Sequence, residues 1–123
     1  MSPEAWVRLG AALMGLDVAL GAFAAHGLKG RLSAEMLQVF ETGARYQAYH
    51  ALALVAVGLI AARWPSRGVE NAGWCFLAGV VLFSGSLYAL ALTGARRLGL
   101  VTPVGGLLFL AGWALLAFAR LRA

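Results

Sequence analysis

The stretch 72–93, AGWCFLAGVVLFSGSLYALALT, decides the fold class, because it runs for 22 residues without a charged side chain. An α-helix of ~20 apolar residues is long enough to cross the ~30 Å hydrocarbon core of a bilayer. Working outward from this stretch, further apolar runs cover residues 6–25, 44–62 and 100–119. The pattern predicts an all-α, four-span transmembrane helix bundle that forms a single integral membrane domain over residues 1–123.

The composition of the whole chain agrees with this prediction. Of its 123 residues 62% are hydrophobic and 12% are charged, whereas a soluble domain is about half apolar and about one quarter charged. A domain of this size cannot bury so much apolar surface, so the excess must face lipid. This composition excludes a disordered chain, a disulfide-stapled secreted domain and a multi-domain enzyme, and the single cysteine, Cys75, excludes an internal disulfide.

The net charge of +5 comes from cations that stand singly or in pairs beside the apolar runs. This placement is typical of residues that set topology and contact anionic headgroups, and nucleic-acid binding would need a clustered basic face. We therefore expect membrane lipids as partners, with a homo-oligomer or another membrane protein as further candidates, and no nucleic acid. With four spans, each side holds five cations: Arg8, Arg63, Arg67, Arg120 and Arg122 on one, Lys29, Arg31, Arg45, Arg96 and Arg97 on the other. The positive-inside rule then gives no orientation.

The connections between the spans carry their own signals. Pro65 ends the second run, and Thr102-Pro103 is typical of a helix start. After the first run, Ser33 can cap a helix that has Glu35 in its first turn. One face of that helix would be apolar, formed by Met36, Leu37 and Phe40. These residues predict a short amphipathic helix over residues 33–41, lying in the headgroup layer or folded back onto the bundle.

Asp17 interrupts the first apolar run near its middle. An ionised Asp there costs ~2.5–3.5 kcal/mol on insertion scales, so we expect it to face the bundle, on the same side as Gly10, Gly21 and Ala24. It is a candidate proton site, and the alternative is a hydrogen-bonded acid within a packed interface. The interruption also disfavours a secretory signal peptide, which the small-x-small pattern at 22–24 would otherwise allow. Close helix contacts are predicted at small-xxx-small pairs, namely Ala11/Gly15, Gly21/Ala25 and Gly58/Ala62, with Gly21 against another helix.

A polar cluster marks the start of the second span. Glu41 precedes Arg45 by four residues, the favourable order for an ion pair. Tyr46 and His50 share the adjacent face, and we expect them to point inward, toward Ser84 and Tyr88 of the third span or toward the turn at His26. The cluster is either a pocket that binds a headgroup or passes protons through His50, or an interhelical hydrogen-bond network. No catalytic residue, cofactor or metal site is predicted, because neither ligand spacing nor a phosphate loop is present.

Four strings resemble the YgdD/YwdK-type family of small multi-pass inner-membrane proteins, a domain of unknown function. They are LGAFAAHGL at 20–28, ETGARYQAYHALA at 41–53, LFSGSLY at 82–88 and VTPVGG at 101–106. The resemblance implies a four-span protein of the bacterial inner membrane and brings no established reaction. It marks motif positions at His26, Glu41, Tyr46, His50, Ser84, Ser86, Tyr88, Thr102 and Pro103. Asp17 falls outside the strings, and Ala25 stands where glycine is expected.

Two classes of function remain open. The first is a non-enzymatic membrane module that binds lipid or a partner protein. The second is a small proton-coupled transporter or channel that uses Asp17, His50 or both. The chain resembles small multidrug-resistance exporters in its four spans, its acid in the first span and its balanced charge, although those exporters use Glu. Two membrane orientations would favour the transporter, and one orientation the module.

Overall fold

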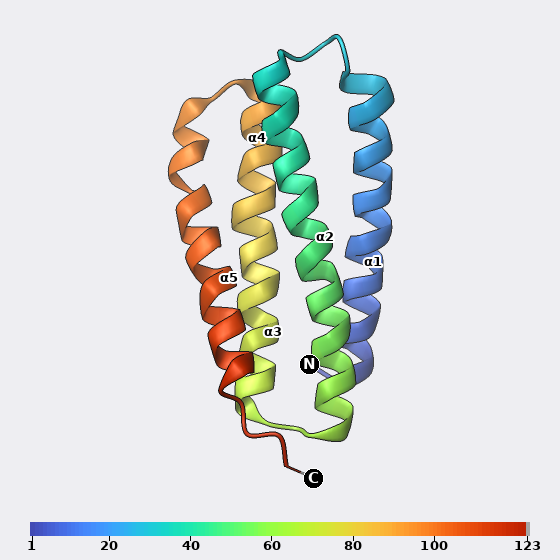
Figure 1. Cartoon of the computed structure of the whole chain (residues 1–123), viewed down its shortest axis with the longest axis vertical. Helices are drawn as coiled ribbons and strands as arrows, with labels where there is room; N and C mark the ends of the chain where they lie inside the picture. The colour runs from blue at the N-terminus through green and yellow to red at the C-terminus, as the bar shows by residue number, and fades with distance from the viewer. Residues whose placement is uncertain (123) are drawn as a thin grey trace.

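The structure, a computed structural model, describes residues 1–122, and these fold into four helical rods that run alternately up and down (Figure 1). Each rod consists of one to three consecutive helical segments. In chain order they are α1 (Pro3–Phe23) with the π-helical turn η1 (Ala24–Leu28), α2 (Ala34–Arg63), α3 (Arg67–Gly79) with the π-helical η2 (Val80–Ser84) and α4 (Gly85–Thr93), and the 3-10 turn η3 (Arg96–Leu100) with α5 (Thr102–Ala117). The predicted all-helical class is confirmed.

Within the described part of the chain, three rods are long and apolar enough to cross a membrane: Pro3–Leu28, Arg67–Thr93 and Arg96–Ala117. They correspond to the first, third and fourth predicted spans. The rod built by α2 is not among them, and its first half carries charged side chains such as Glu35 and Arg45 and the polar Gln47 and His50. The crossing by α2 therefore stays a prediction.

The predicted separate helix over residues 33–41 is wrong in one respect. Its start is as expected, since the Ser33 hydroxyl accepts a hydrogen bond from the Met36 backbone N–H at 3.1 Å. The helix then continues without a break to Arg63, so the amphipathic segment is the first part of α2. No proline interrupts this stretch, and Gly43 stays helical beneath the Tyr88 ring: a Cβ there would lie 2.9 Å from Tyr88 Cε1. The connection between the first two rods is therefore residues 29–33.

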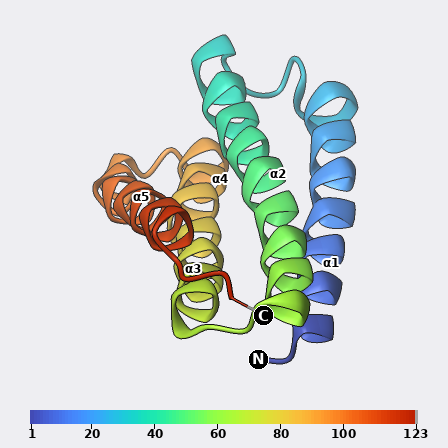
Figure 2. The same cartoon turned by 60° about the horizontal axis from the view of Figure 1, so that its bottom comes forward.

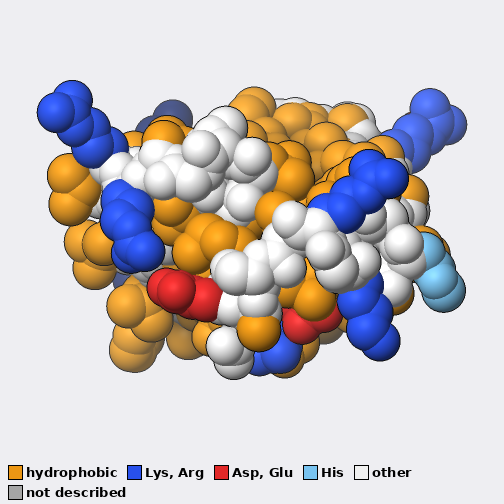
Figure 3. Space-filling view, turned by 90° about the horizontal axis from the view of Figure 1, so that it is seen from above, with side chains coloured by type: hydrophobic (Ala, Val, Ile, Leu, Met, Phe, Trp, Pro, Cys, Tyr) orange, Lys and Arg blue, Asp and Glu red, His pale blue; other side chains and the backbone are white. Residues whose placement is uncertain are grey.

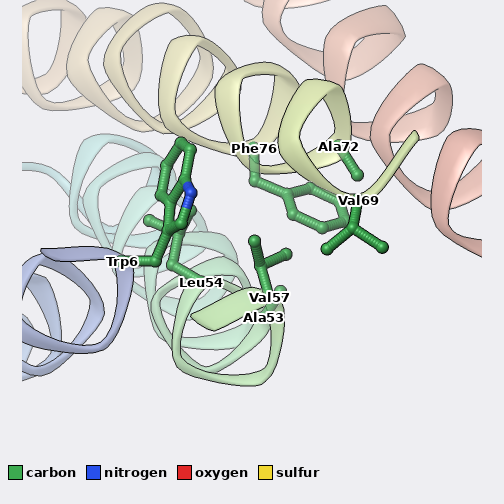
Figure 4. Packing of buried hydrophobic residues seen from close by; sticks show 7 residues of the cluster. All are labelled: Trp6, Ala53, Leu54, Val57, Val69, Ala72 and Phe76. Carbon is green, nitrogen blue, oxygen red and sulfur yellow. The ribbon is translucent and has the colours of Figure 1, made fainter. Parts of the chain in front are cut away.

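The rods lie side by side in chain order, with α1 and α5 at opposite edges (Figures 1 and 2). Helix α1 packs against α2, α2 against α3 and α4, and α5 against α3 and η2. Both chain ends lie at one end of the bundle, and the connection over residues 29–33 lies at the other. Two apolar clusters fill the interior. The one nearer the termini contains Trp6, Ala53, Leu54, Val57, Val69, Ala72 and Phe76 (Figure 4), and the other contains Ala24, Leu28, Phe40 and Ala91.

Close helix contacts form at glycines other than the main predicted one. Gly21 is exposed, and a Cβ at this position would have no atom within 4 Å, so its predicted helix contact is wrong. A Cβ at Gly10 would lie 2.6 Å from the Ala51 carbonyl oxygen, and one at Gly58 would lie 2.6 Å from the Pro3 carbonyl oxygen. Gly10 lies on the face of α1 that meets α2, whereas no atom of a neighbouring helix approaches Gly21.

Candidate functional site

His50 lies inside the bundle, with 4% of its surface exposed. Its Nδ1 is 2.7 Å from the Tyr46 carbonyl oxygen, and its Nε2 is 3.0 Å from Nε1 of Trp113 on α5. A carbonyl oxygen only accepts and an indole N–H only donates, so the ring is neutral and carries its proton on Nδ1. The Phe109 ring stacks on it at 3.5 Å between centroids. His50 therefore links α2 to α5, and both of its nitrogens are occupied.

A second set of hydrogen bonds links α2 to its other neighbours. The Tyr88 hydroxyl donates to Gln47 Oε1 at 2.7 Å, and Gln47 Nε2 donates to the Leu13 carbonyl oxygen at 2.8 Å. The Ser84 hydroxyl donates to the Gly43 carbonyl oxygen at 2.7 Å. These bonds join α1, α2 and the third rod near the middle of the bundle. They match the predicted alternative of an interhelical hydrogen-bond network.

Asp17 lies beside this network. It is half-buried, its Oδ1 is enclosed, and that oxygen has no hydrogen-bond partner within residues 1–122. Asp17 follows Leu13 by about one helical turn, and the Leu13 carbonyl oxygen is the acceptor of the Gln47 amide. Asp17 itself takes no part in these hydrogen bonds.

Several candidate residues do not join the cluster. Glu41 and Arg45 are both exposed, and the ion pairs formed within the described residues are Met1–Glu70 and Glu4–Arg8, so the predicted Glu41–Arg45 pair does not form. An exposed pair of this kind contributes only ~0–1 kcal/mol, too little to hold two long side chains together. His26 is exposed on η1, away from His50.

Two other expectations about the cluster need correction. Tyr46 is 37% exposed and packs at the edge of the bundle, with its ring centroid 4.9 Å from that of Phe83. Its ring also stacks toward Phe109 of α5, with 6.4 Å between centroids, so aromatic contacts between rods take the place of the expected contact with Ser84 or Tyr88. His50 does point inward, but its polar contact is Trp113 instead of Ser84 or Tyr88. The rotation of α2 brings His50 to the α5 side, while Gly43 and Gln47 face the third rod.

Three polar side chains with interhelical roles were missed in the sequence. Gln47 is 2% exposed, and a lone amide three residues before His50 was a signal for it. Trp113 of α5 is the second, since its indole N–H donates to His50. Glu70 accepts hydrogen bonds from Nε1 of Trp6 at 2.9 Å and of Trp74 at 3.1 Å. The spacing of four residues between Glu70 and Trp74 was visible, but nothing local indicated the approach of Trp6.

A groove of about 740 Å³ lies where α3 begins and α5 ends, at the end of the bundle that carries both termini. Its walls are mostly apolar, and two arginines stand at its outer end. The lining residues are Ser66, Arg67, Gly68, Ala111, Ala114, Leu115, Phe118, Ala119 and Arg120. Because the first N–H groups of a helix have no partner within the helix, the start of α3 adds positive character beside the arginines.

The opposite end of the bundle is also basic. Figure 3 shows Lys and Arg side chains standing at the rim of this end, with acidic side chains and a His side chain also in view among apolar and uncharged groups. Arg96 and Arg97 belong to η3 at this end, and both are exposed. The two ends of the molecule thus offer matched pairs of exposed arginines.

Comparison with known proteins agrees with this architecture. The family model described as "Protein of unknown function (DUF423)" matches residues 20–106. The chain belongs to this family. It is 48% identical over 117 residues to a UPF0382 membrane protein of Staphylococcus haemolyticus, covering 95% of each chain. It is also 44% identical over 120 residues to the UPF0382 membrane protein YwdK of Bacillus subtilis, covering 97% of this chain and 98% of YwdK. No solved structure matches the chain.

The family assignment confirms the predicted resemblance and a multi-pass helical membrane protein of unknown function. The relatives are named as membrane proteins, and their names state no reaction, ligand or partner. Function therefore has to be argued from the site.

Proposed function

We propose that this protein is a non-enzymatic, four-span module of the bacterial cell membrane that binds anionic phospholipid in the groove between α3 and α5. The observation that carries the proposal is the composition of that groove, in which apolar walls lead to Arg67 and Arg120. A phospholipid has the same two-part chemistry, with apolar chains below an anionic phosphate. The inner-membrane location implied by the family resemblance belongs to the same proposal.

The four-span part of the proposal rests on α2. This helix has 30 residues, so it is about 45 Å long and exceeds the ~30 Å hydrocarbon layer. Its most polar interior side chains, Gln47 and His50, are buried and hydrogen-bonded to other helices, so they do not face lipid. Both termini lie at the same end of the bundle (Figure 1), as an even number of crossings requires.

In this groove we expect electrostatic attraction, and not the hydrophobic effect, to provide most of the affinity for lipid. Lipid chains are already in an apolar medium, so the apolar walls gain little from hydrophobic transfer and mainly provide shape. The guanidinium groups of Arg67 and Arg120 can bind phosphate oxygens in a bidentate manner. Each cation near an anionic surface contributes ~1 kcal/mol. We therefore expect selectivity for anionic over zwitterionic headgroups.

The polar interior supports a binding module more than a proton-coupled transporter. Both nitrogens of His50 are engaged with Tyr46 and Trp113, so a proton could pass through the ring only if one of these bonds broke. The hydroxyls of Ser84 and Tyr88 are likewise engaged with α2. These groups stabilise the bundle, and the groove stays available for a ligand.

The test is lipid retention measured by native mass spectrometry from nanodiscs that contain equal amounts of phosphatidylglycerol and phosphatidylcholine. We expect the protein to retain phosphatidylglycerol preferentially. The double variant Arg67→Gln/Arg120→Gln should weaken this binding roughly 30-fold, since two contributions of ~1 kcal/mol are lost. Arg96→Gln/Arg97→Gln removes the same charge from the opposite end and should leave binding nearly unchanged. Equal losses in both double variants would show nonspecific attraction and would contradict the groove.

A further inference from the structure

We propose that Asp17 is a membrane-embedded proton-binding site, in which the side chain is a neutral carboxylic acid with one oxygen enclosed in the bundle, about one helical turn from the Leu13 carbonyl that Gln47 binds. The inference does not depend on lipid binding in the groove, which lies at the end of the bundle. It rests on the hydrogen-bond directions around Asp17 and on the charges that face it.

The described part of the chain offers no free donor to an ionised Asp17. The hydroxyl of Tyr88 donates to Gln47, and the amide N–H of Gln47 donates to the Leu13 carbonyl oxygen. Backbone N–H groups at this level of α1 are engaged within the helix. Oδ1 of Asp17 is nevertheless enclosed, without a partner among residues 1–122. A carboxylate needs donors for its negative charge, whereas a carboxylic acid is neutral and much less costly to leave without them. Protonation thus removes a charge that no donor among these residues stabilises.

An ionised Asp17 also lacks a compensating opposite charge among residues 1–122. On α1 the nearest titratable groups are Arg8 and His26, both exposed and more than two helical turns away. On α2 the charged residues at this level are Glu41 and Arg45, also exposed, and neither forms an ion pair with Asp17 in the described structure. On α4 the titratable neighbour is Tyr88. A buried charge without a counter-charge is unfavourable, and such groups take up a proton instead.

The site is also placed for proton exchange. Asp17 is only half-buried, so its carboxyl group is enclosed at Oδ1 and open on another side. Among the interior groups, the His50 nitrogens and the Tyr88 hydroxyl are already engaged in hydrogen bonds. Unlike these two groups, Asp17 can gain or lose a proton without breaking an interhelical hydrogen bond shown in the described structure.

The experiment uses dicyclohexylcarbodiimide on the full chain in phosphatidylcholine vesicles. The reagent reacts with a neutral acid, because the acid proton moves to a carbodiimide nitrogen while the carboxyl oxygen bonds to the central carbon. Rearrangement then gives a stable N-acylurea that peptide mass mapping detects. We expect Asp17 to be modified at neutral pH, with the rate falling as the pH rises. Asp17→Asn should lose the modification, and exposed Glu35 should react only on acidification. An unmodified Asp17 at neutral pH in the folded protein would overturn the proposal.

A second measurement separates a proton from a metal cation. Asp17→Asn mimics the neutral acid in shape and cannot titrate. We expect its thermal unfolding midpoint in detergent to equal that of the unchanged protein below about pH 4, where Asp is protonated in the folded and the unfolded chain alike. Its midpoint should exceed that of the unchanged protein increasingly as the pH rises from there, because the unfolded chain gives up a proton that the folded protein keeps. Glu35→Gln should show no such divergence. A lower midpoint of Asp17→Asn at every pH, or a midpoint of the unchanged protein that rises with sodium concentration, would mean that the carboxylate form is required and would refute proton binding.

Discussion

His50 shows how a side chain that resembles a proton relay is used for structure. The ring accepts a hydrogen bond from the Trp113 indole, stacks on Phe109, and is almost fully enclosed. His50→Ala would leave the indole N–H without its acceptor and remove the stacking contact. We expect it to lower the free energy of unfolding by roughly 2–4 kcal/mol, measured by reversible denaturation in detergent micelles.

The matched control for His50 is Tyr49→Ala. Tyr49 is the preceding aromatic residue on α2 and is 53% exposed, so its removal should cost under about 1 kcal/mol. A double-mutant cycle with Trp113→Phe should give a coupling energy of about 1 kcal/mol for the hydrogen bond itself. Equal tolerance of His50→Ala and Tyr49→Ala would mean that the α2–α5 link contributes nothing to stability.

For single residues, the sequence was enough to identify the polar side chains of the interior, but not their hydrogen-bond partners. His50, Ser84 and Tyr88 stood out because polar groups in apolar runs are costly and need partners. Their partners depend on the rotation of α2 between two neighbouring rods, and local spacing does not determine that rotation. The Trp113 indole and the Gln47 amide are 63 and 34 residues away in sequence from the groups they contact, His50 and Leu13.

Among the helices, α1 and α2 make the closest approach at glycine. A Cβ at Gly10 would lie 2.6 Å from the Ala51 carbonyl oxygen and 2.8 Å from the Val55 backbone nitrogen. Because both atoms belong to a helix backbone, the helices would have to move apart. We expect Gly10→Ala to destabilise the protein by about 1–3 kcal/mol, measured as a lower unfolding midpoint in detergent.

Gly15→Ala on the same helix is the control. No atom lies within 4 Å of a Cβ at this position, so the substitution should be neutral or should stabilise the helix by up to ~1 kcal/mol through helix propensity. If Gly10→Ala and Gly15→Ala had the same unfolding midpoint, the contact between α1 and α2 would not depend on the small residue at Gly10.

The helices themselves were largely predictable, while their faces were not. The Ser33 cap and the start at Thr102-Pro103 agree with the sequence signals. Lipid-facing helices are apolar on all sides, however, so periodicity cannot indicate which side is buried. Gly21 therefore fitted a small-residue pattern and still faces outward. The continuity of α2 through Gly43 was also hidden, because it depends on the Tyr88 ring of another rod.

For the whole molecule, the topology depends on α2, because its crossing of the membrane would make it the fourth span. The described structure puts the connection over residues 29–33 and the two termini at opposite ends (Figure 1). If α2 crosses, its two ends lie on opposite sides of the bilayer. A membrane-impermeant maleimide then distinguishes them, in a background where Cys75 has been replaced by Ala.

Arg31 precedes α2 and Arg63 is its last residue, and both are exposed. In intact cells we expect the reagent to label only one of the variants Arg31→Cys and Arg63→Cys, and to label the other only after the membrane is permeabilised. Arg122→Cys, beyond α5, should be labelled from the same side as Arg63→Cys, because α5 and α2 end at the same end of the bundle (Figure 1). This pattern also requires that all copies of the protein have the same orientation in the membrane, as we expect of a binding module. Labelling of each position from both sides would instead favour the dual orientation of a small exporter. Labelling of Arg31→Cys and Arg63→Cys from the same side alone would mean that α2 does not cross, and the four-span architecture would have to be abandoned.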